Sequence, residues 1–144
     1  MEGLRRTLLL VSLLVVLEGM AAAAGGHPGR SLPGAPHNIS KDDRGLRRAV
    51  LTATHSFNNQ SNDAFLFRAS AINTAQRQII KGIRYIMQVQ ISRTICRKRD
   101  NSPDLSKCGF QPDGALRQTL SCHFEVWAMP WLHQMKTLFF FCRS

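Results

Sequence analysis

The stretch GIRYIMQVQIS, residues 82–92, sets the architecture of this chain because its apolar and polar side chains alternate. Successive side chains of a β-strand point to opposite faces, so a period of two places one set on a core and the other toward solvent. The apolar set consists of Ile83, Tyr85, Met87, Val89 and Ile91. We therefore expect a half-buried strand in a sheet that is covered on one face.

The residues before this strand predict another strand and a hairpin that joins the two. Phe65, Phe67 and the run from Ile72 to Ile80 supply its apolar positions, although the pattern from Ala69 to Ala75 is ambiguous. The expected hairpin tip is QIIKG, residues 78–82, whose final glycine frees the backbone to approach another surface closely. This tip presents isoleucines to water, where compact proteins usually place polar turn formers.

An amphipathic helix of about four turns is expected before the sheet. Its apolar positions recur at helical spacing and are Leu46, Ala49, Val50, Ala53 and Phe57. Ser40, followed three positions later by Asp43, resembles a capping box at the start of this helix. The segment NNQSND, residues 58–63, should end the helix, because side chains that bond to their own backbone favour a turn.

The C-terminal part of the chain predicts two more strands. They are LSCHFEVWAMPW, residues 120–131, and MKTLFFFC, residues 135–142. The segment 97–114 contains prolines, glycines and aspartates and is interpreted as a long connection. The elements together predict an α+β fold, with one long helix packed on an antiparallel sheet of four or five strands.

The N-terminal residues indicate an exported protein. Two arginines precede an apolar run from Leu8 to Leu17 and a small-residue stretch, which is typical of a secretory signal peptide over residues 1–24. Residues 25–36 are rich in Gly, Pro and Ala and are expected to form a flexible arm, and residues 37–144 form the folded domain. No stretch is long enough to predict a membrane span, so we expect a secreted, extracellular protein.

Four cysteines, Cys96, Cys108, Cys122 and Cys142, lie in the C-terminal half. In an exported chain they are better interpreted as two disulfides than as metal ligands, and the spacing of a C-x-x-C metal site is absent. Four cysteines allow three pairings. Sequence neighbours, Cys96 with Cys108 and Cys122 with Cys142, suit successive hairpins best.

The composition favours anionic partners and argues against catalysis. The formal net charge is +10, which favours an anionic polysaccharide, a membrane surface or an acidic protein, whereas nucleic acid is not expected for an exported chain. A solvated basic face without a specific partner is the alternative. No nucleophile motif or phosphate loop occurs, and the five histidines suit no metal site, so we expect neither an enzyme nor a cofactor or metal.

Two exposed apolar segments suit insertion into a cleft. One is the tip at residues 78–82, and the other is the pair Pro130 and Trp131, which follows a strand and should occupy another hairpin loop. Tryptophan is an effective interface anchor. If the two loops share one end of the sheet, Gly34 of the arm becomes a third candidate contact.

These features together resemble the type 2 cystatins over the whole mature chain. The resemblance implies a reversible, tight-binding inhibitor of papain-like cysteine proteases such as cathepsins, in which the arm and two loops fill the active-site cleft as a wedge. A monomer is expected. The protease-binding residues that the resemblance implies are Gly34, Gln78, Ile79, Ile80, Lys81, Gly82, Pro130 and Trp131.

The resemblance also implies a contact with legumain, an asparagine-specific protease. Family members that inhibit legumain present an asparagine in the turn after the helix, and Asn62 matches that residue. A turn-forming asparagine without a partner is the alternative reading of this position. Asn59 and Asn38 begin glycosylation sequons, and a glycan at either place would lie near Asn62 or near the arm.

Some positions depart from the family pattern. Ile80 stands where valine is usual, and Lys81 adds a charge to the first loop. Pro33 and Ala35 flank the arm glycine and reduce the contribution expected of the arm, because proline fixes the local backbone. Two rival functions remain open at this point: a basic host-defence or polysaccharide-binding protein on the same scaffold, and a relative that has lost inhibition.

Overall fold

The computed structural model describes residues 34–100 and 104–144. The predicted signal segment, residues 1–24, and the arm as far as residue 33 lie outside the described residues. Within the described part, no helix has the length and apolar character that a membrane crossing requires.

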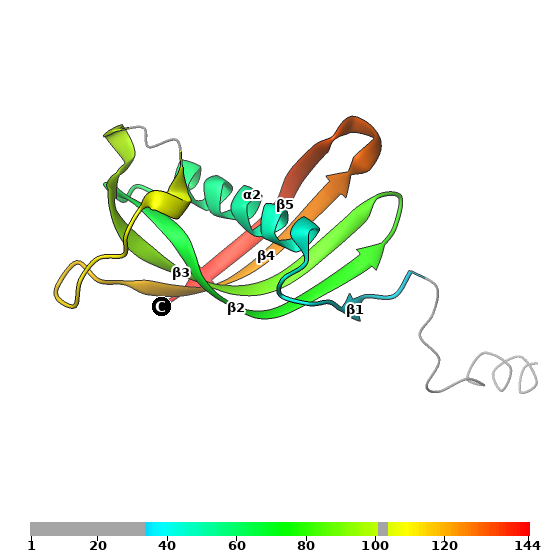
Figure 1. Cartoon of the computed structure of the whole chain (residues 1–144), viewed down its shortest axis with the longest axis horizontal. Helices are drawn as coiled ribbons and strands as arrows, with labels where there is room; N and C mark the ends of the chain where they lie inside the picture. Colours follow the sequence, from blue (N-terminus) through cyan, green and yellow to red (C-terminus); the bar gives the residue numbers. More distant parts are fainter. Residues whose placement is uncertain (1–33, 101–103) are drawn as a thin grey trace, which may run out of the picture. The chain divides into compact units, whose positions relative to one another are not determined.

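One helix lies across one face of a five-stranded antiparallel sheet (Figure 1). The helix is α2, Arg44–Gln60, and the strands follow one another in the sheet in chain order. They are β1, His37–Asn38; β2, Phe65–Ile79; β3, Ile83–Arg97; β4, Thr119–Met129; and β5, Gln134–Arg143. The α+β prediction is confirmed. Strand β1 was not anticipated, because two residues paired with the end of β2 are too short to leave a pattern in the sequence.

Strand β3 has the alternation that the sequence predicted. Tyr85, Met87, Val89 and Ile91 are at most 3% exposed and form the centre of the core under the helix. The opposite set points to the helix-free face of the sheet, where Gln88 is exposed. The period of two therefore identified the covered face correctly.

Strand β2 is a single strand across the stretch whose pattern was ambiguous. Its pairing with β3 shifts register between Ala69 and Ala71 and again between Ile72 and Thr74. Such irregularities place an extra residue in one strand and reverse which face the following side chains occupy. The ambiguity in the sequence therefore has a structural cause, since the alternation is interrupted twice within the ambiguous stretch, in addition to a shift near Phe65.

The helix begins at a different cap from the one expected. The Asp43 carboxylate accepts the backbone N–H of Leu46 at 2.9 Å, so Asp43 is the N-cap. Ser40 does not cap the helix; its Oγ accepts the N–H of Asp42 at 3.1 Å in the preceding turn. The capping-box prediction was wrong in register because both residues favour local backbone bonds and the sequence did not rank them. The predicted apolar stripe is correct, with Leu46, Ala49 and Ala53 fully buried.

Two disulfides, Cys96–Cys108 and Cys122–Cys142, join sequence neighbours. Cys122 and Cys142 are directly opposite each other in the β4–β5 ladder, so their bond closes that hairpin near the C-terminus. The other disulfide ties the end of β3 to the connecting segment, which contains the short 3₁₀ turns η1, Lys98–Asp100, and η2, Leu105–Lys107. No cysteine is free in the described part of the chain.

The buried side chain of Asn58 joins the end of the helix to the sheet. Its Nδ2 donates to the carbonyl of Phe67 at 2.9 Å, and its Oδ1 accepts the N–H of Phe67 at 2.8 Å. Asn58 is 3% exposed, so water cannot replace these two bonds in the folded protein. A polar residue of the predicted turn segment thus holds α2 against β2.

We expect Asn58→Ala to lower the free energy of unfolding by about 3 kcal/mol, because it leaves a buried N–H and a buried carbonyl without partners. Urea denaturation followed by circular dichroism measures the loss. The matched control is Asn59→Ala at the exposed neighbouring position, which should change stability by less than about 0.5 kcal/mol. Equal effects of the two substitutions would contradict the bridging role of Asn58.

Candidate functional site

The hairpin between β2 and β3 presents two apolar side chains at its tip. Ile79 is 62% exposed and Ile80 is 42% exposed. The N–H of Ile80 donates to the carbonyl of Gly82 at 3.1 Å, which closes the turn. Gly82 has a φ of 98°, a conformation that glycine adopts at little cost. The tip is therefore a defined turn with an apolar surface.

The connection between β4 and β5 is a second short turn with an apolar surface. It is η3, Pro130–Leu132, in which Trp131 is 53% exposed and Leu132 is 52% exposed. His133 ends the turn in the left-handed region with a φ of 49°, and its N–H donates to the carbonyl of Pro130 at 3.2 Å. Histidine is one of the residues that tolerate this region.

Both turns lie at the same end of the sheet and are joined through the last part of β4 (Figure 1). The indole Nε1 of Trp127 donates to the carbonyl of Lys81 at 2.9 Å. The ring of Trp127 also packs edge-to-face on Trp131, with centroids 6.3 Å apart. The structure therefore brings together the two loops that the sequence singled out separately.

Gly82 is required for this contact because there is no room for a side chain. A Cβ on Gly82 would lie 2.6 Å from the carbonyl oxygen of Ala128 and 2.6 Å from Nε1 of Trp127. Both distances are well below van der Waals contact, and the first neighbour is backbone that cannot rotate away. Gly82 thus brings the backbone of the first turn against β4.

Gly34 lies beside the first turn. Its φ is 84°, and a Cβ there would be 3.3 Å from the carbonyl oxygen of Ile79. The third segment predicted for the site is therefore next to the tip of the first hairpin. All eight residues that the family resemblance implies for protease binding lie at this end of the sheet.

A polar network on the helix-free face supports the start of this hairpin. The guanidinium of Arg84 donates to Oε1 of Gln78 at 3.2 Å and forms an ion pair with Glu125, whose side chain is 6% exposed. The other oxygen of Glu125 lies 3.0 Å from Nε2 of His123. Burial, together with the positive charge of Arg84, lowers the pKa of His123 below its usual value. The network fixes the side chain of Gln78 on that face.

The turn after the helix, at the opposite end of the β2–β3 hairpin, exposes Asn62 between two braced neighbours. The guanidinium of Arg93 contacts the carboxylate of Asp63 at 2.6 Å, and the ammonium of Lys98 donates to the carbonyl of Ser61 at 2.5 Å. Burial alone would raise the pKa of Asp63, but hydrogen bonds from Arg93 and from the N–H of Phe65 lower it. The backbone on both sides of Asn62 is thus held in place.

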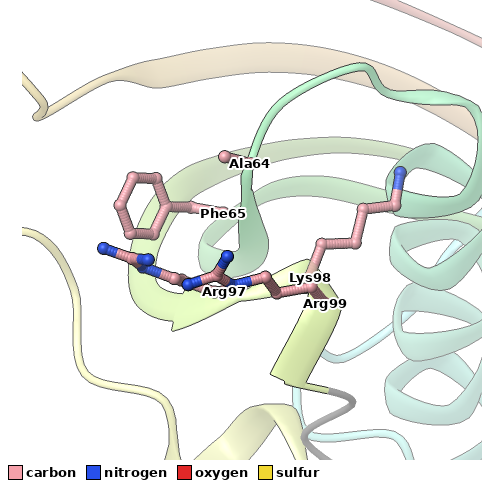
Figure 2. Close-up of a pocket in the computed structure, with 5 residues that line it drawn as sticks. All are labelled: Ala64, Phe65, Arg97, Lys98 and Arg99. Carbon is pink, nitrogen blue, oxygen red and sulfur yellow. The ribbon is translucent and has the colours of Figure 1, made fainter.

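An open pocket of about 620 Å³ lies next to this turn. It is lined by Ala64 and Phe65 at the start of β2 and by three consecutive cations, Arg97, Lys98 and Arg99. Figure 2 shows Arg97 and Arg99 extending to the same side of the pocket near Phe65, whereas Lys98 points away from them. Within residues 34–100 and 104–144, no group of His, Cys, Asp and Glu side chains could hold a metal ion.

Comparison with known proteins identifies the family. A model described as the cystatin domain matches residues 34–131. The chain belongs to the cystatin family. Mouse cystatin-F is 40% identical over 111 residues, which cover 77% of this chain and 76% of the mouse protein. Human cystatin-C is 36% identical over 130 residues, which cover 89% of this chain and 88% of the human protein.

A solved structure agrees with this assignment. The crystal structure of dimeric human cystatin F superposes with a TM-score of 0.74 at 39% identity, covering 83% of this chain and 95% of that chain. Members of the cystatin family are inhibitors of cysteine proteases and not enzymes. The two disulfides of this cystatin fit an oxidising, extracellular environment.

Sequence reasoning missed Trp127 and the Arg84–Glu125 pair, which support the two loops of this cystatin. A signal for Trp127 was present. It occupies a position of β4 that alternates onto the helix-free face, where a tryptophan needs a contact other than the core. The partner of that contact could not be identified, because the pairing of β3 with β4 has to be known first.

We expect Gly82→Ala to separate the first turn from β4, because the added methyl group would collide with Ala128 and Trp127 in a backbone conformation that already disfavours alanine. The free energy of unfolding should fall by about 1 to 3 kcal/mol. Tryptophan fluorescence should shift to longer wavelength as Trp127 becomes more solvated.

The matched control is Gly114→Ala, since Gly114 also has a positive φ, of 149°, but has open space around its Cα. It should leave the fluorescence unchanged. A Gly82→Ala protein with the emission maximum of the wild type would contradict the close approach of the first turn to β4.

Proposed function

We propose that this cystatin is a reversible, tight-binding inhibitor of papain-like cysteine proteases that inserts a wedge into the active-site cleft. The wedge consists of Gly34 in the arm, the first turn at residues 78–82, and the second turn with Pro130 and Trp131. The observation that carries the proposal is that two exposed apolar turns lie side by side and share Trp127 as a support. An isolated apolar turn would not justify it.

The geometry suits binding without cleavage. In the first turn, the carbonyl of Lys81 accepts the Trp127 N–H and the N–H of Ile80 is bonded to Gly82. A protease needs an extended peptide with free backbone groups in its cleft, whereas these groups are already engaged inside the inhibitor. Isoleucine and tryptophan side chains remain exposed to make the contact.

Preorganisation supports tight binding. Ordering flexible loops on association costs about 0.5 to 1.5 kcal/mol for each immobilised side chain, and rigid loops avoid much of that cost. Here both turns end strands of one sheet, and the β4–β5 hairpin is closed by the Cys122–Cys142 disulfide. The arm should contribute less, because Pro33 precedes Gly34 and restricts the backbone that would extend along the cleft.

We further propose that Asn62 binds legumain. The observation in favour is that the side chain is exposed while the neighbouring backbone is held by Arg93 and Lys98. This surface is at the opposite end of the long hairpin from the wedge, so one protease of each kind could bind without sharing contacts. A glycan on exposed Asn59 would lie three residues away and would compete with this contact.

The same proposal assigns this protein to the extracellular space, with glycans at Asn38 and Asn59. Both asparagines are exposed, as glycosylation requires. Asn38 is on β1, four residues after Gly34, and its amide accepts a weak hydrogen bond from Gln76 at 3.3 Å. A glycan there would project beside the arm and would further reduce the contribution of the arm to protease binding.

We expect Trp131→Ala to raise the inhibition constant for papain at least about 30-fold, because a central aromatic anchor contributes about 2 kcal/mol or more to an interface. Steady-state inhibition assays measure the change. Thermal unfolding should remain close to that of the wild type, since Trp131 is half exposed.

Leu116→Ala is the control for Trp131→Ala. Leu116 is 52% exposed and precedes β4, at the end opposite the second turn, so its loss should leave inhibition of papain unchanged. A wild-type protein that fails to inhibit papain but binds heparin at low salt would contradict the proposal and favour the basic polysaccharide-binding alternative.

We expect Asn62→Ala to abolish inhibition of legumain and to leave inhibition of papain within about twofold of the wild type. The physical reason is that an asparagine-specific protease needs the carboxamide, whereas the wedge is at the other end of the sheet. Asn59→Ala, made in protein that carries no glycans, is the control and should retain both activities. If the Asn62→Ala protein inhibits legumain as well as the wild type does, the proposed contact is contradicted, and Asn62 only forms the turn.

A further inference from the structure

We propose that Trp127 is a positioning residue that sets the first and second turns in one fixed relation and thereby determines how tightly both enter a protease cleft. The inference rests on the proposed function, since it assigns to Trp127 the support of the wedge and not a contact with the protease. It goes beyond that function by identifying a residue outside both turns on which their joint geometry depends.

The position of Trp127 in the sheet is the first step. It lies in β4 opposite Arg84 of β3 and Lys136 of β5, on the face that the helix does not cover. It is half-buried although no core lies on that side. Besides its strand neighbours on that face, Trp127 contacts both turns at the end of the sheet.

The second step is that the indole uses different parts of its structure for each turn. The N–H donates to the carbonyl of Lys81 in the first turn, at 2.9 Å. The ring packs on Trp131 of the second turn, with an interplanar angle of 71°. Tryptophan is the side chain that combines a large ring with an N–H donor in this way. Phenylalanine would keep a ring but would lack the donor.

The third step is that the first turn is shaped to receive the indole. Gly82 lies so close to Nε1 of Trp127 that even a methyl group would collide with it. The same virtual methyl group would be 3.3 Å from Cη2 of Trp131, so the two tryptophans and the glycine meet at one place. The first turn can approach the two tryptophans this closely because residue 82 carries no side chain.

The consequence for binding depends on the fraction of molecules whose turns are correctly placed. A wedge binds only when both turns are correctly placed, and its apparent affinity falls in proportion to the fraction of molecules in that arrangement. If Trp127 holds the turns together, its loss lowers that fraction, and the loss of affinity depends on whether Trp131 is there to be positioned. Removing Trp127 and Trp131 should therefore have non-additive effects.

The experiment is a double-mutant cycle on the inhibition of papain by the full mature chain, with Trp127→Ala, Trp131→Ala and the double variant. When Trp131 is present, we expect Trp127→Ala to raise the inhibition constant about 30-fold. In the Trp131→Ala background, the same substitution should raise it less than about 5-fold. Trp127→Phe keeps a ring but removes the N–H donor, and we expect a rise of about threefold to tenfold. It also serves as the conservative variant if Trp127→Ala folds poorly.

Amide hydrogen exchange gives a second readout that does not depend on any protease. In Trp127→Phe, the Ile80 N–H should exchange faster, because the turn that it closes has lost its bond to β4. The matched control is Phe141→Ala, which removes another exposed aromatic residue from the same face of the sheet, where it stacks on His123. The control should change neither inhibition nor Ile80 exchange.

The outcomes separate this inference from the proposed function. If the wild type inhibits papain and Trp131→Ala weakens it, but the effects of the two tryptophan substitutions are additive or Trp127→Phe is without effect, the positioning role is overturned and the wedge stands. If Trp127→Ala lowers only the melting temperature, the residue is structural and the inference is also overturned. A wild type without inhibition overturns both.

Discussion

The antiparallel pairing of β2 with β3, two strands of 15 residues each, is the constraint on which the rest of the structure depends. It separates the first turn from the Asn62 turn by the length of the hairpin. Its pleat directs Tyr85, Met87 and Val89 toward the helix and leaves the opposite face free for the polar network. The β2–β3 hairpin therefore places the first turn of the wedge and the Asn62 turn at opposite ends, and the β4–β5 hairpin adds the second turn beside the first.

The helix-free face has a role that its exposure would not suggest. Arg84 and Glu125 form an ion pair there in which the carboxylate is buried and the guanidinium is 32% exposed. Such a pair is a poor source of net stability, because desolvation of the carboxylate offsets the attraction. The pair instead fixes the side chain of Gln78 at the base of the first turn. Together with Trp127, the pair contacts the loops from this face, while the helix-covered face provides the hydrophobic core of the fold.

The sequence predicted elements wherever a regular period was present and failed where structure depends on partners. Alternation in β3 and helical spacing in α2 follow from side-chain direction alone, so both were correct. The interrupted alternation near Ala71 and the choice of Asp43 over Ser40 as the cap depend on register and local competition, which one sequence does not resolve. The same holds for the site. The exposed turns were predictable as segments, whereas the contact of Trp127 with the first turn could be identified only from the pairing of β3 with β4.

The location of the stabilising groups explains how the turns can be both exposed and rigid. Apolar turns in water are prone to collapse onto the nearest apolar surface, and here that surface would be the core under the helix. Strong restraints lie away from the tips: the Cys122–Cys142 bond at the far end of β4–β5 and the core contacts of β3. At the tips, Gly82 and Trp127 hold the first turn against the end of β4 on the helix-free face. Because these restraints order the backbone of the turns, Ile79, Ile80 and Trp131 remain exposed for a partner. Binding then costs less conformational entropy, since the turns are already ordered.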